Sequence, residues 1–256
     1  MYCWTDRPVW PQGIAWPKKA AKIPKELRWD LWLGTAKNVN YIDNLVPFNW
    51  RGWWDFGTGA LGDMGCHIIG PPFKLLELGY PTEVSGSAST VYNGIFKEGI
   101  YPESGPVSSS LKFTYEQKNG KKLELYWMDG GITPERPIEL DSKENMNDVM
   151  GDFTKLNDFE GATLFVGTKG VLACELFGNN PKLFVKGQLQ DVKFPAPTRP
   201  LVEGDTAGHQ QQWVKACKAG FGTYTSSSFA ESGPLTEIVL MGNLAVRSYL
   251  HRENGK

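Results

Sequence analysis

The sequence predicts an α+β fold in which an open, mostly antiparallel sheet has helices packed on one of its faces. Pairs of strand-like segments are joined by short polar turns, which is typical of β-hairpins. Helical segments precede and follow these strands instead of alternating with them, as happens when helices gather on one side of an antiparallel sheet. The βαβ alternation of a nucleotide-binding domain is not found, so no Rossmann domain is expected in this chain.

The first 56 residues form an entry segment rich in Trp and Pro. Residues 2–5 predict a short strand, and a stretch with little periodicity follows up to residue 27. A short helix is expected at 28–33, where Gly34 ends it. We expect most of the aromatic rings to anchor this irregular segment to the sheet, the alternative being a wall for a sugar or a nicotinamide. Eight of the ten tryptophans lie here: Trp4, Trp10, Trp16, Trp29, Trp32, Trp50, Trp53 and Trp54.

Residues 57–79 carry a helical pattern that Pro71 and Pro72 interrupt. Consecutive prolines end or kink a helix, so two helical pieces or one bent helix are expected. A GxGxxG dinucleotide motif begins at Gly57. The aromatic residues before it make a poor buried strand, however, and a true motif needs such a strand. We therefore assign no nucleotide site to this motif.

Glycine recurs at every third position of the same segment, at Gly59, Gly62 and Gly65. One face of the predicted helix therefore carries no side chains. A bare helix face lets another element of the protein, or a flat ligand ring, approach the backbone closely. Each glycine costs a helix about 1 kcal/mol relative to alanine, and the close approach must offset that cost.

The sheet is expected within residues 81–195 and the C-terminal helices within 204–250, all in one domain of residues 1–256. Strands are expected at 83–92, 107–116, 121–128, 162–167, 171–177, 182–186 and 190–194. Short turns join the second strand to the third and the fourth to the fifth, which makes two hairpins. Two helices follow, at 205–219 and 228–250.

A near-neutral charge balance limits the partners of the protein. The net charge is −1, and 41% of the residues are hydrophobic. A nucleic-acid-binding protein needs a basic surface to neutralise phosphates, so no nucleic acid partner is expected. No apolar run approaches the roughly 20 residues needed to span a bilayer. The four cysteines lie far apart and are expected to be buried free thiols: Cys3, Cys66, Cys174 and Cys217.

Asp63 and His67 are the first candidates for chemistry. Four positions separate them, so on a helix they project from the same side, one turn apart. A carboxylate beside an imidazole can orient the ring and raise its basicity, which suits a general base for a hydroxyl proton. A satisfied structural pair is the alternative. A metal site would need further ligands, and none is apparent nearby, so no metal is expected.

The segment 50–79 resembles the signature helix of the Gfo/Idh/MocA oxidoreductases, which include glucose–fructose oxidoreductase and inositol dehydrogenase. That signature is a glycine cluster followed by Asp-x-Gly-x-His. It is matched here by Gly57, Gly59, Asp63, Gly65 and His67. Residues 4–13 and 233–237 extend the resemblance along the chain as the family's C-terminal domain. Gly70 departs from the pattern, because many relatives carry an aspartate there.

The resemblance implies hydride transfer between a carbon of a sugar or cyclitol and NAD or NADP, with His67 as the acid–base group and Asp63 beside it. The family's nucleotide fold precedes this region, so we expect an upstream domain, absent from this chain, to hold the cofactor. The isolated chain is then expected to be inactive. A homo-oligomer formed through the sheet is also implied. Two alternatives are open: an NAD-dependent glycoside hydrolase of the same family, and a non-catalytic sugar-binding or assembly module.

Three residues next to the signature are candidates for substrate binding. Arg51 is expected to bind a carboxylate or hydroxyl of the substrate, and an ion pair with Asp55 is the alternative. Trp53 and Trp54 are both candidates for stacking on a sugar ring. We expect one of them to do so and the other only to pack.

Four residues outside the signature segment are weaker candidates. Asp129, at a strand end, and His209, near a helix start, are candidate substrate ligands, with turn-stabilising and structural roles as the alternatives. On resemblance alone, Trp10 and Gln12 are assigned to the nicotinamide of an upstream domain.

Overall fold

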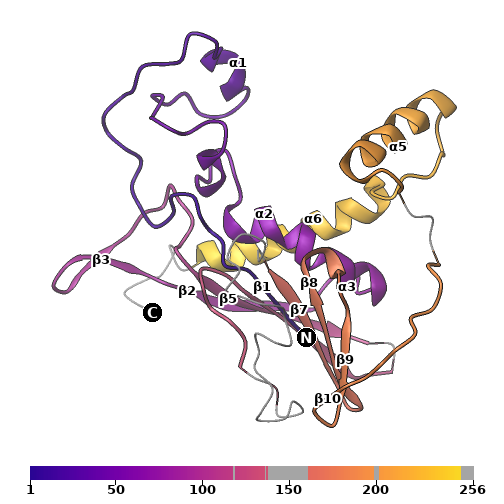
Figure 1. Ribbon diagram of the computed structural model, residues 1–256. Coiled ribbons are helices and arrows are strands. Elements are labelled where there is room, and N and C mark those ends of the chain that lie inside the picture. The colour runs from indigo at the N-terminus through magenta and orange to yellow at the C-terminus, as the bar shows by residue number, and fades with distance from the viewer. Residues whose placement is uncertain (118, 136, 138–160, 199–201, 249–256) are drawn as a thin grey trace.

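The computed structural model describes residues 1–117, 119–135, 137, 161–198 and 202–248. Its centre is an eight-stranded sheet with the strand order β10-β9-β8-β7-β1-β6-β5-β2 (Figure 1). The strands are β1 (Tyr2–Trp4), β2 (Glu83–Ala88), β5 (Ser109–Glu116), β6 (Lys122–Met128), β7 (Ala162–Gly167), β8 (Gly170–Glu175), β9 (Lys182–Val185) and β10 (Gln188–Leu189).

The short strand β1 lies in the middle of the sheet, between β6 and β7. It pairs parallel with β6 and antiparallel with β7, and the other recorded pairings of this sheet are antiparallel. The two predicted hairpins are present as β5–β6 and β7–β8. An open and mostly antiparallel sheet is therefore confirmed.

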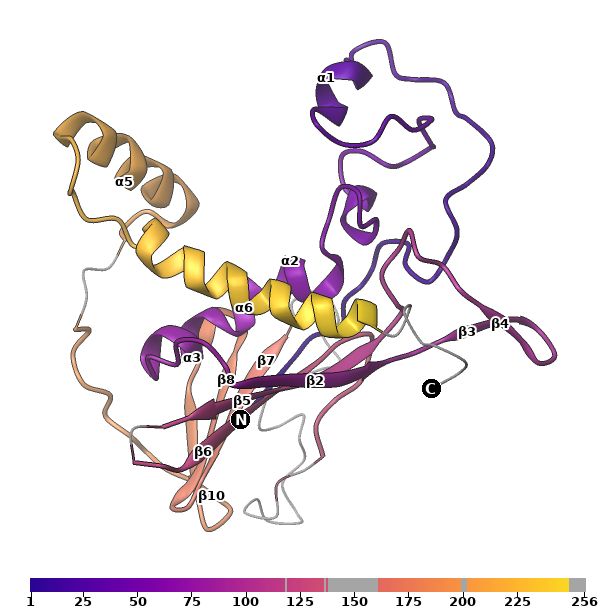
Figure 2. The same ribbon diagram turned by 180° about the vertical axis from the view of Figure 1, so that it is seen from behind.

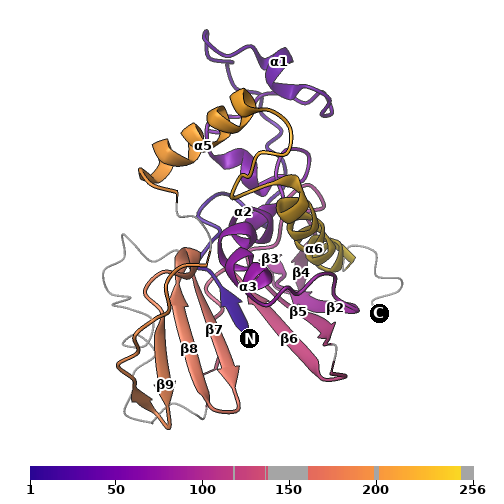
Figure 3. The same ribbon diagram turned by 90° about the vertical axis from the view of Figure 1, so that its right-hand side faces the viewer.

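Three helices cover one face of the sheet: α2 (Gly59–Ile68), α3 (Gly70–Leu75) and α6 (Phe229–Ser248) (Figure 3). The helical segment is divided at Ile69, because Pro71 and Pro72 fall in the first turn of α3, where a missing N–H is tolerated. Side chains of α2 and α6 meet the inner sides of β1, β5 and β6 to form the main core. Its largest buried members are Trp127, Phe113, Leu61, Ile68, Ile69, Leu111, Leu125 and Ile238.

The glycines of α2 allow α6 to approach closely. A Cβ atom on Gly65 would lie 3.1 Å from Val239 Cγ2 of α6, and one on Gly242 of α6 would lie 2.6 Å from Leu61 Cδ2 of α2. Asn243 also donates a hydrogen bond from Nδ2 to the carbonyl of Thr58, which precedes α2, at 3.0 Å. The glycine face of α2 therefore packs against another element of the protein, α6, which is one of the two partners expected from the sequence.

The opposite face of the sheet carries a second apolar cluster. Side chains alternate between the two faces along a strand, so Cys3 points to the helices and Trp4 points away from them. The buried members of this second cluster are Trp4, Ala162, Leu164, Val171, Ala173 and Phe184. The sheet is thus apolar on both sides.

Residues 6–56 form a lobe that extends from one end of the sheet (Figure 1). It contains the short helix α1 (Trp29–Leu33) and the 3-10 helix η1 (Asn49–Gly52), with Gly34 after α1 at a φ of 53°. Its aromatic rings contact one another: Trp16 lies edge-on to Trp53 at 4.7 Å between ring centroids, and Trp29 stacks on Trp32 at 5.0 Å. Most of the tryptophans of the lobe therefore belong to a small core of the lobe itself, separate from that of the sheet. The expectation that most of these rings anchor the segment to the sheet is wrong, because they find apolar partners within the lobe.

The structure differs from the sequence prediction at three places in the sheet. The strand predicted at 83–92 ends at Ala88, and the chain then forms a separate hairpin of β3 (Val91–Gly94) and β4 (Lys97–Gly99). The strand predicted at 190–194 is wrong, because the final strand is β10 at 188–189. The strand predicted at 171–177 ends at Glu175, and the 3-10 helix η2 (Leu176–Gly178) follows.

The predicted C-terminal helices are present. The helix α5 (Asp205–Ala219) has the predicted bounds and stands away from the sheet (Figure 2). The helix predicted at 228–250 is α6, whose last two predicted positions lie outside the described residues. None of the helices in the described ranges combines the length and the apolar character needed to cross a bilayer.

Candidate functional site

The outward side of α2 presents Asp63 and His67. Leu61, Met64 and Ile68 on the same helix are buried, whereas His67 is exposed and Asp63 is half-buried. The burial pattern follows the helical period, since residues four apart share a side of the helix. The helix packs against α6 by its inner side, and its outward side carries the exposed His67.

Arg51, in η1, fixes the carboxylate of Asp63. Its Nε donates to Asp63 Oδ1 at 2.8 Å, and its Nη1 donates to the carbonyl of Phe48 at 3.0 Å. The guanidinium carbon also lies 4.5 Å from the centre of the Phe48 ring and 4.8 Å from that of Trp50. A planar cation between two rings, with two donors engaged, has little freedom to turn. Arg51 therefore positions Asp63, and the alternative pair with Asp55 is not formed.

His67 makes a single recorded contact among the described residues, with the ring of Phe177. The two ring centroids are 5.0 Å apart and the planes meet at 81°, an edge-to-face arrangement. Within the described ranges no hydrogen bond engages the imidazole nitrogens. Asp63, expected to orient this ring, bonds to Arg51 instead, because the guanidinium offers it a charged donor at short range. His67 and Asp63 share a side of the helix without a direct bond.

Asp129 is buried at the end of β6, with 3% of its surface exposed. It accepts hydrogen bonds from the backbone N–H of Ser109 at 2.5 Å, from Ser109 Oγ at 2.7 Å and from Trp127 Nε1 at 2.9 Å. Burial raises the pKa of Asp129 to about 6, although these three donors act in the opposite direction. The carboxyl joins β5 to β6, so binding a substrate would require it to give up these bonds.

The residues assigned to the cofactor are also engaged within the protein. Trp10 donates from Nε1 to Gln12 Oε1 at 2.8 Å, and Gln12 donates from Nε2 to the carbonyl of Pro106 at 2.5 Å. Both side chains are buried. Contact with a nicotinamide would require these polar groups to exchange partners.

The two tryptophans proposed for sugar stacking differ in burial. Trp53 is 2% exposed and belongs to the aromatic core of the lobe, so no face of its ring is open to a ligand. Trp54 is half-buried and packs against the main core, with the guanidinium carbon of Arg247 5.4 Å from its ring centre. Packing accounts for the position of both rings.

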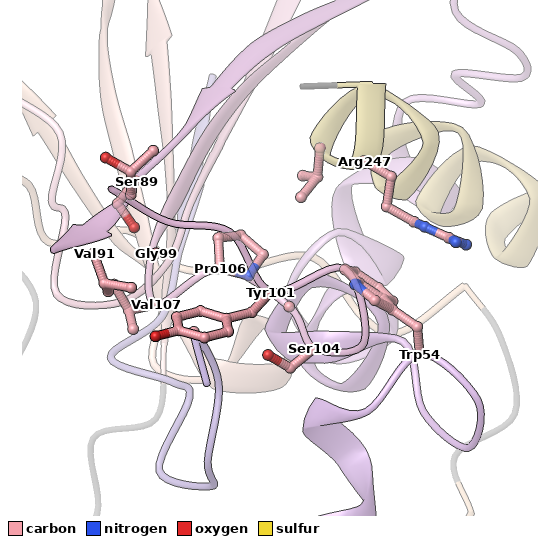
Figure 4. A pocket seen from close by; sticks show the side chains of 13 residues that line it. Trp54, Ser89, Val91, Gly99, Tyr101, Ser104, Pro106, Val107 and Arg247 are labelled. Atoms are coloured by element: carbon pink, nitrogen blue, oxygen red, sulfur yellow. The ribbon is translucent and has the colours of Figure 1, made fainter. Parts of the chain in front are cut away.

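A small cavity adjoins Trp54 and Arg247 (Figure 4). Its volume is about 20 Å³, which is room for about one water molecule. Two of its hydroxyl groups have protein partners: Tyr101 donates to Asn93 at 2.6 Å, and Ser104 donates to the carbonyl of Ile14 at 2.8 Å. Neither Asp63 nor His67 lines the cavity, so it lies apart from the candidate site.

His209 lies on α5, beside an open hollow of about 500 Å³. Its Nδ1 is 3.5 Å from Ser226 Oγ, which donates to Gln212 Oε1 at 2.8 Å. Trp213 also lines this hollow and is 67% exposed. His209 thus belongs to a helix that stands away from the sheet (Figure 2), and no recorded contact joins it to His67.

All four cysteines are free, with Cys3 and Cys174 buried and Cys66 and Cys217 exposed, so the expected burial is wrong for two of them. Burial raises the pKa of Cys3 to about 12. No group of three or more His, Cys, Asp or Glu side chains gathers within the described ranges.

Phe177 was not identified from the sequence. It appeared there as the last residue of a predicted strand, although Gly178, Asn179 and Asn180 follow it. Such residues are typical of turns. They could have indicated that the strand ends earlier, but not that the turn returns to α2.

The segment that carries α2 is similar to a domain of a known enzyme family. Residues 10–89, which run from the lobe through α2 and α3 to β2, match the family model for the C-terminal alpha/beta domain of the Gfo/Idh/MocA oxidoreductases. The resemblance seen in the sequence is therefore confirmed over residues 10–89, which are similar to this oxidoreductase-family C-terminal domain. The comparison with curated proteins gave no match.

Proposed function

We propose that this chain is the substrate-binding half of an NAD(P)-dependent oxidoreductase that acts on a sugar or cyclitol. The observation that carries the proposal is the placing of His67 on the free side of α2, one turn from a carboxylate held by Arg51. An imidazole whose nitrogens make no hydrogen bond within the described part of the chain is suited to remove a proton from a hydroxyl group, or to return one. The match to the oxidoreductase C-terminal domain supports this reaction class.

In this proposal His67 transfers a proton and Asp63 accepts a hydrogen bond from the substrate. His67 takes the proton of the substrate hydroxyl at a ring nitrogen as the carbon is oxidised. The Asp63 carboxylate, paired with Arg51, supplies a hydrogen-bond acceptor to a neighbouring hydroxyl. NAD(P) would accept or supply the hydride.

The glycine-rich segment of this chain does not fit the dinucleotide. The residues before α2 form η1 and a turn instead of a buried strand. The space opened by Gly65 is filled by Val239, and a Cβ on Gly62 would lie 1.8 Å from Thr58 Oγ1. At Gly59, where α2 begins, an added Cβ would lie 3.3 Å from Gln12 Oε1 and 3.6 Å from the Trp54 ring, so these side chains lie beside the helix start that a pyrophosphate would need to approach. The cofactor is therefore proposed to be held by a separate nucleotide-binding domain.

A homo-oligomer formed through the sheet face opposite the helices is part of the proposal. Tyr2, Met128 and Val166 on that face are only partly buried and adjoin the second apolar cluster. An apolar surface of this kind favours association. Light scattering of the purified protein tests this, and a monomer at all concentrations would contradict it.

The test of the function combines binding and turnover. Titration of the purified chain with myo-inositol or D-glucose is expected to shift the imidazole NMR signals of His67, and calorimetry is expected to show no tight binding of NAD. In the intact enzyme, the same sugars are expected to change the absorbance of the nicotinamide. Tight NAD binding by the chain, or sugars that leave His67 unperturbed, would contradict the proposal. Release of nitrophenol from an aryl glycoside would assign a hydrolase instead.

A further inference from the structure

Phe177 adopts a backbone conformation that its side chain disfavours. Its φ is 62° and its ψ is 10°, the left-handed region in which a Cβ atom crowds the following carbonyl. Glycine or asparagine usually occupies such a position, because either meets a smaller penalty. Burial does not offset the penalty, since 55% of the side chain is exposed. Strained residues of this kind concentrate at functional sites.

The turn around Phe177 is held by contacts that do not involve its ring. The N–H of Glu175 donates to the carbonyl of Asn179 at 2.9 Å, and Asn180 Nδ2 donates to Glu175 Oε2 at 2.7 Å. Leu176 packs against the main core. The backbone therefore directs the Phe177 ring outward whether or not the ring makes a contact of its own.

The ring of Phe177 then meets the one imidazole that α2 exposes. The contact with His67 joins η2 to α2 at 5.0 Å between ring centroids and 81° between planes. Because no hydrogen bond fixes the imidazole among the described residues, this aromatic contact is what limits its rotation. Arg51 limits the carboxylate of Asp63 in a comparable way, one turn earlier on the helix.

We infer that Phe177 is a positioning residue for His67: it holds the imidazole in the orientation that receives the substrate proton, and its exposed ring forms an apolar wall of the substrate site. The inference rests on the proposed function. An orienting contact contributes through geometry, so its loss should reduce turnover without removing the proton acceptor itself. An aromatic pair of this strength corresponds to about a 3- to 10-fold effect on kcat/KM.

The chain offers a matched control for the strain. Phe96 also has a positive φ, 57°, and is 97% exposed at the tip of the β3–β4 hairpin. Substitution of either phenylalanine by glycine relieves the same kind of backbone conflict. Only Phe177→Gly removes a contact with His67.

The experiment compares Phe177→Gly, Phe177→Tyr and Phe96→Gly. We expect the urea midpoint of Phe177→Gly to be unchanged or raised, as for Phe96→Gly. The NMR signals of the His67 ring, assigned with His67→Gln, should lose their ring-current shift in Phe177→Gly and keep it in Phe177→Tyr. In the intact enzyme, kcat/KM should fall about 3- to 10-fold in Phe177→Gly, recover in Phe177→Tyr and stay constant in Phe96→Gly.

Two results would overturn the inference. Unchanged His67 signals and turnover in Phe177→Gly would show that the ring does not act on the imidazole. A lowered urea midpoint in that variant would show that the ring serves the fold. Full activity in His67→Gln would instead contradict the proposed function, so the two failures are distinguishable.

Discussion

Arg51 donates from Nε to Asp63 Oδ1 at 2.8 Å, which ties the 3-10 helix of the lobe to the polar side of α2. The two side chains are 25% and 27% exposed, so solvent screens the pair less than it would screen a pair on the open surface. The contact makes the lobe part of the candidate site: a carboxylate on one element is oriented by a cation from another.

Replacing Arg51 by methionine tests this link. The variant should lower the free energy of unfolding by about 1 to 2 kcal/mol, because it removes a partly buried ion pair and a cation between two aromatic rings. Urea unfolding measures the change. Arg28→Met is the control, since the Arg28–Asp30 pair is exposed and its loss should cause no measurable change. An equal effect of the two substitutions would contradict a special role for Arg51.

His67→Gln should lower turnover in the intact enzyme by about 10²- to 10⁴-fold, because it removes a positioned proton acceptor. Its urea midpoint should stay at the wild-type value, since the side chain is exposed. Nicotinamide absorbance measures the turnover, and circular dichroism during urea unfolding measures the midpoint. Retained turnover would remove His67 from the mechanism.

The close packing of α2 against α6 makes Gly242 intolerant of a side chain. A Cβ atom there would lie 2.6 Å from Leu61 Cδ2 and 2.8 Å from Phe113 Cζ. Gly242→Ala should therefore destabilise the protein by about 1 to 3 kcal/mol, despite the better helix propensity of alanine. Gly233→Ala, on the same helix, adds a methyl that meets no atom of another element within 4 Å. We expect it to change the stability by less than about 1 kcal/mol, because the better helix propensity of alanine is opposed by crowding against the following Pro234. Denaturant unfolding of both variants measures the changes, and an equal loss of stability in the two variants would contradict the packing described.

Asp129 should make stability depend on pH. Burial raises its pKa from 3.8 to about 6, so the folded state favours the protonated form. The stabilisation is complete below about pH 4 and is lost as the pH rises through 6, with a total on the order of 3 kcal/mol. In Asp129→Asn this contribution to the pH dependence should vanish. Urea unfolding between pH 4 and pH 7 measures it, and parallel curves for the two proteins would contradict the assignment.

Local patterns were sufficient to predict most elements of this fold. The bounds of α5 follow from its helical periodicity, and the break between α2 and α3 follows from two prolines. The hairpin β3–β4 was missed and β10 was misplaced, because strands this short carry too little alternation. The position of β1 could not be predicted, since its partners lie more than 120 residues away and alternation does not specify neighbours.

The candidate residues of the site could be named from the sequence, but their contacts could not. Helical spacing placed Asp63 and His67 on one side of α2, as the structure shows. The partner of Asp63 depends on how the lobe folds back, and the partner of His67 depends on a turn more than 100 residues later. The spacing of residues along a helix predicts neither of these two contacts. Burial of Trp53 and Asp129 likewise depends on packing among distant segments.

The place of β1 has a consequence for how the chain reaches this structure. Its three residues lie between β6 and β7, and Tyr2 pairs with both Tyr126 and Leu164. During synthesis, β1 therefore lacks its second neighbour until Leu164 has emerged from the ribosome. Closing such distant pairings is slow and leaves strand edges exposed in the meantime. We therefore expect the sheet, and with it the surface on which α2 packs, to be completed late in the folding of this chain.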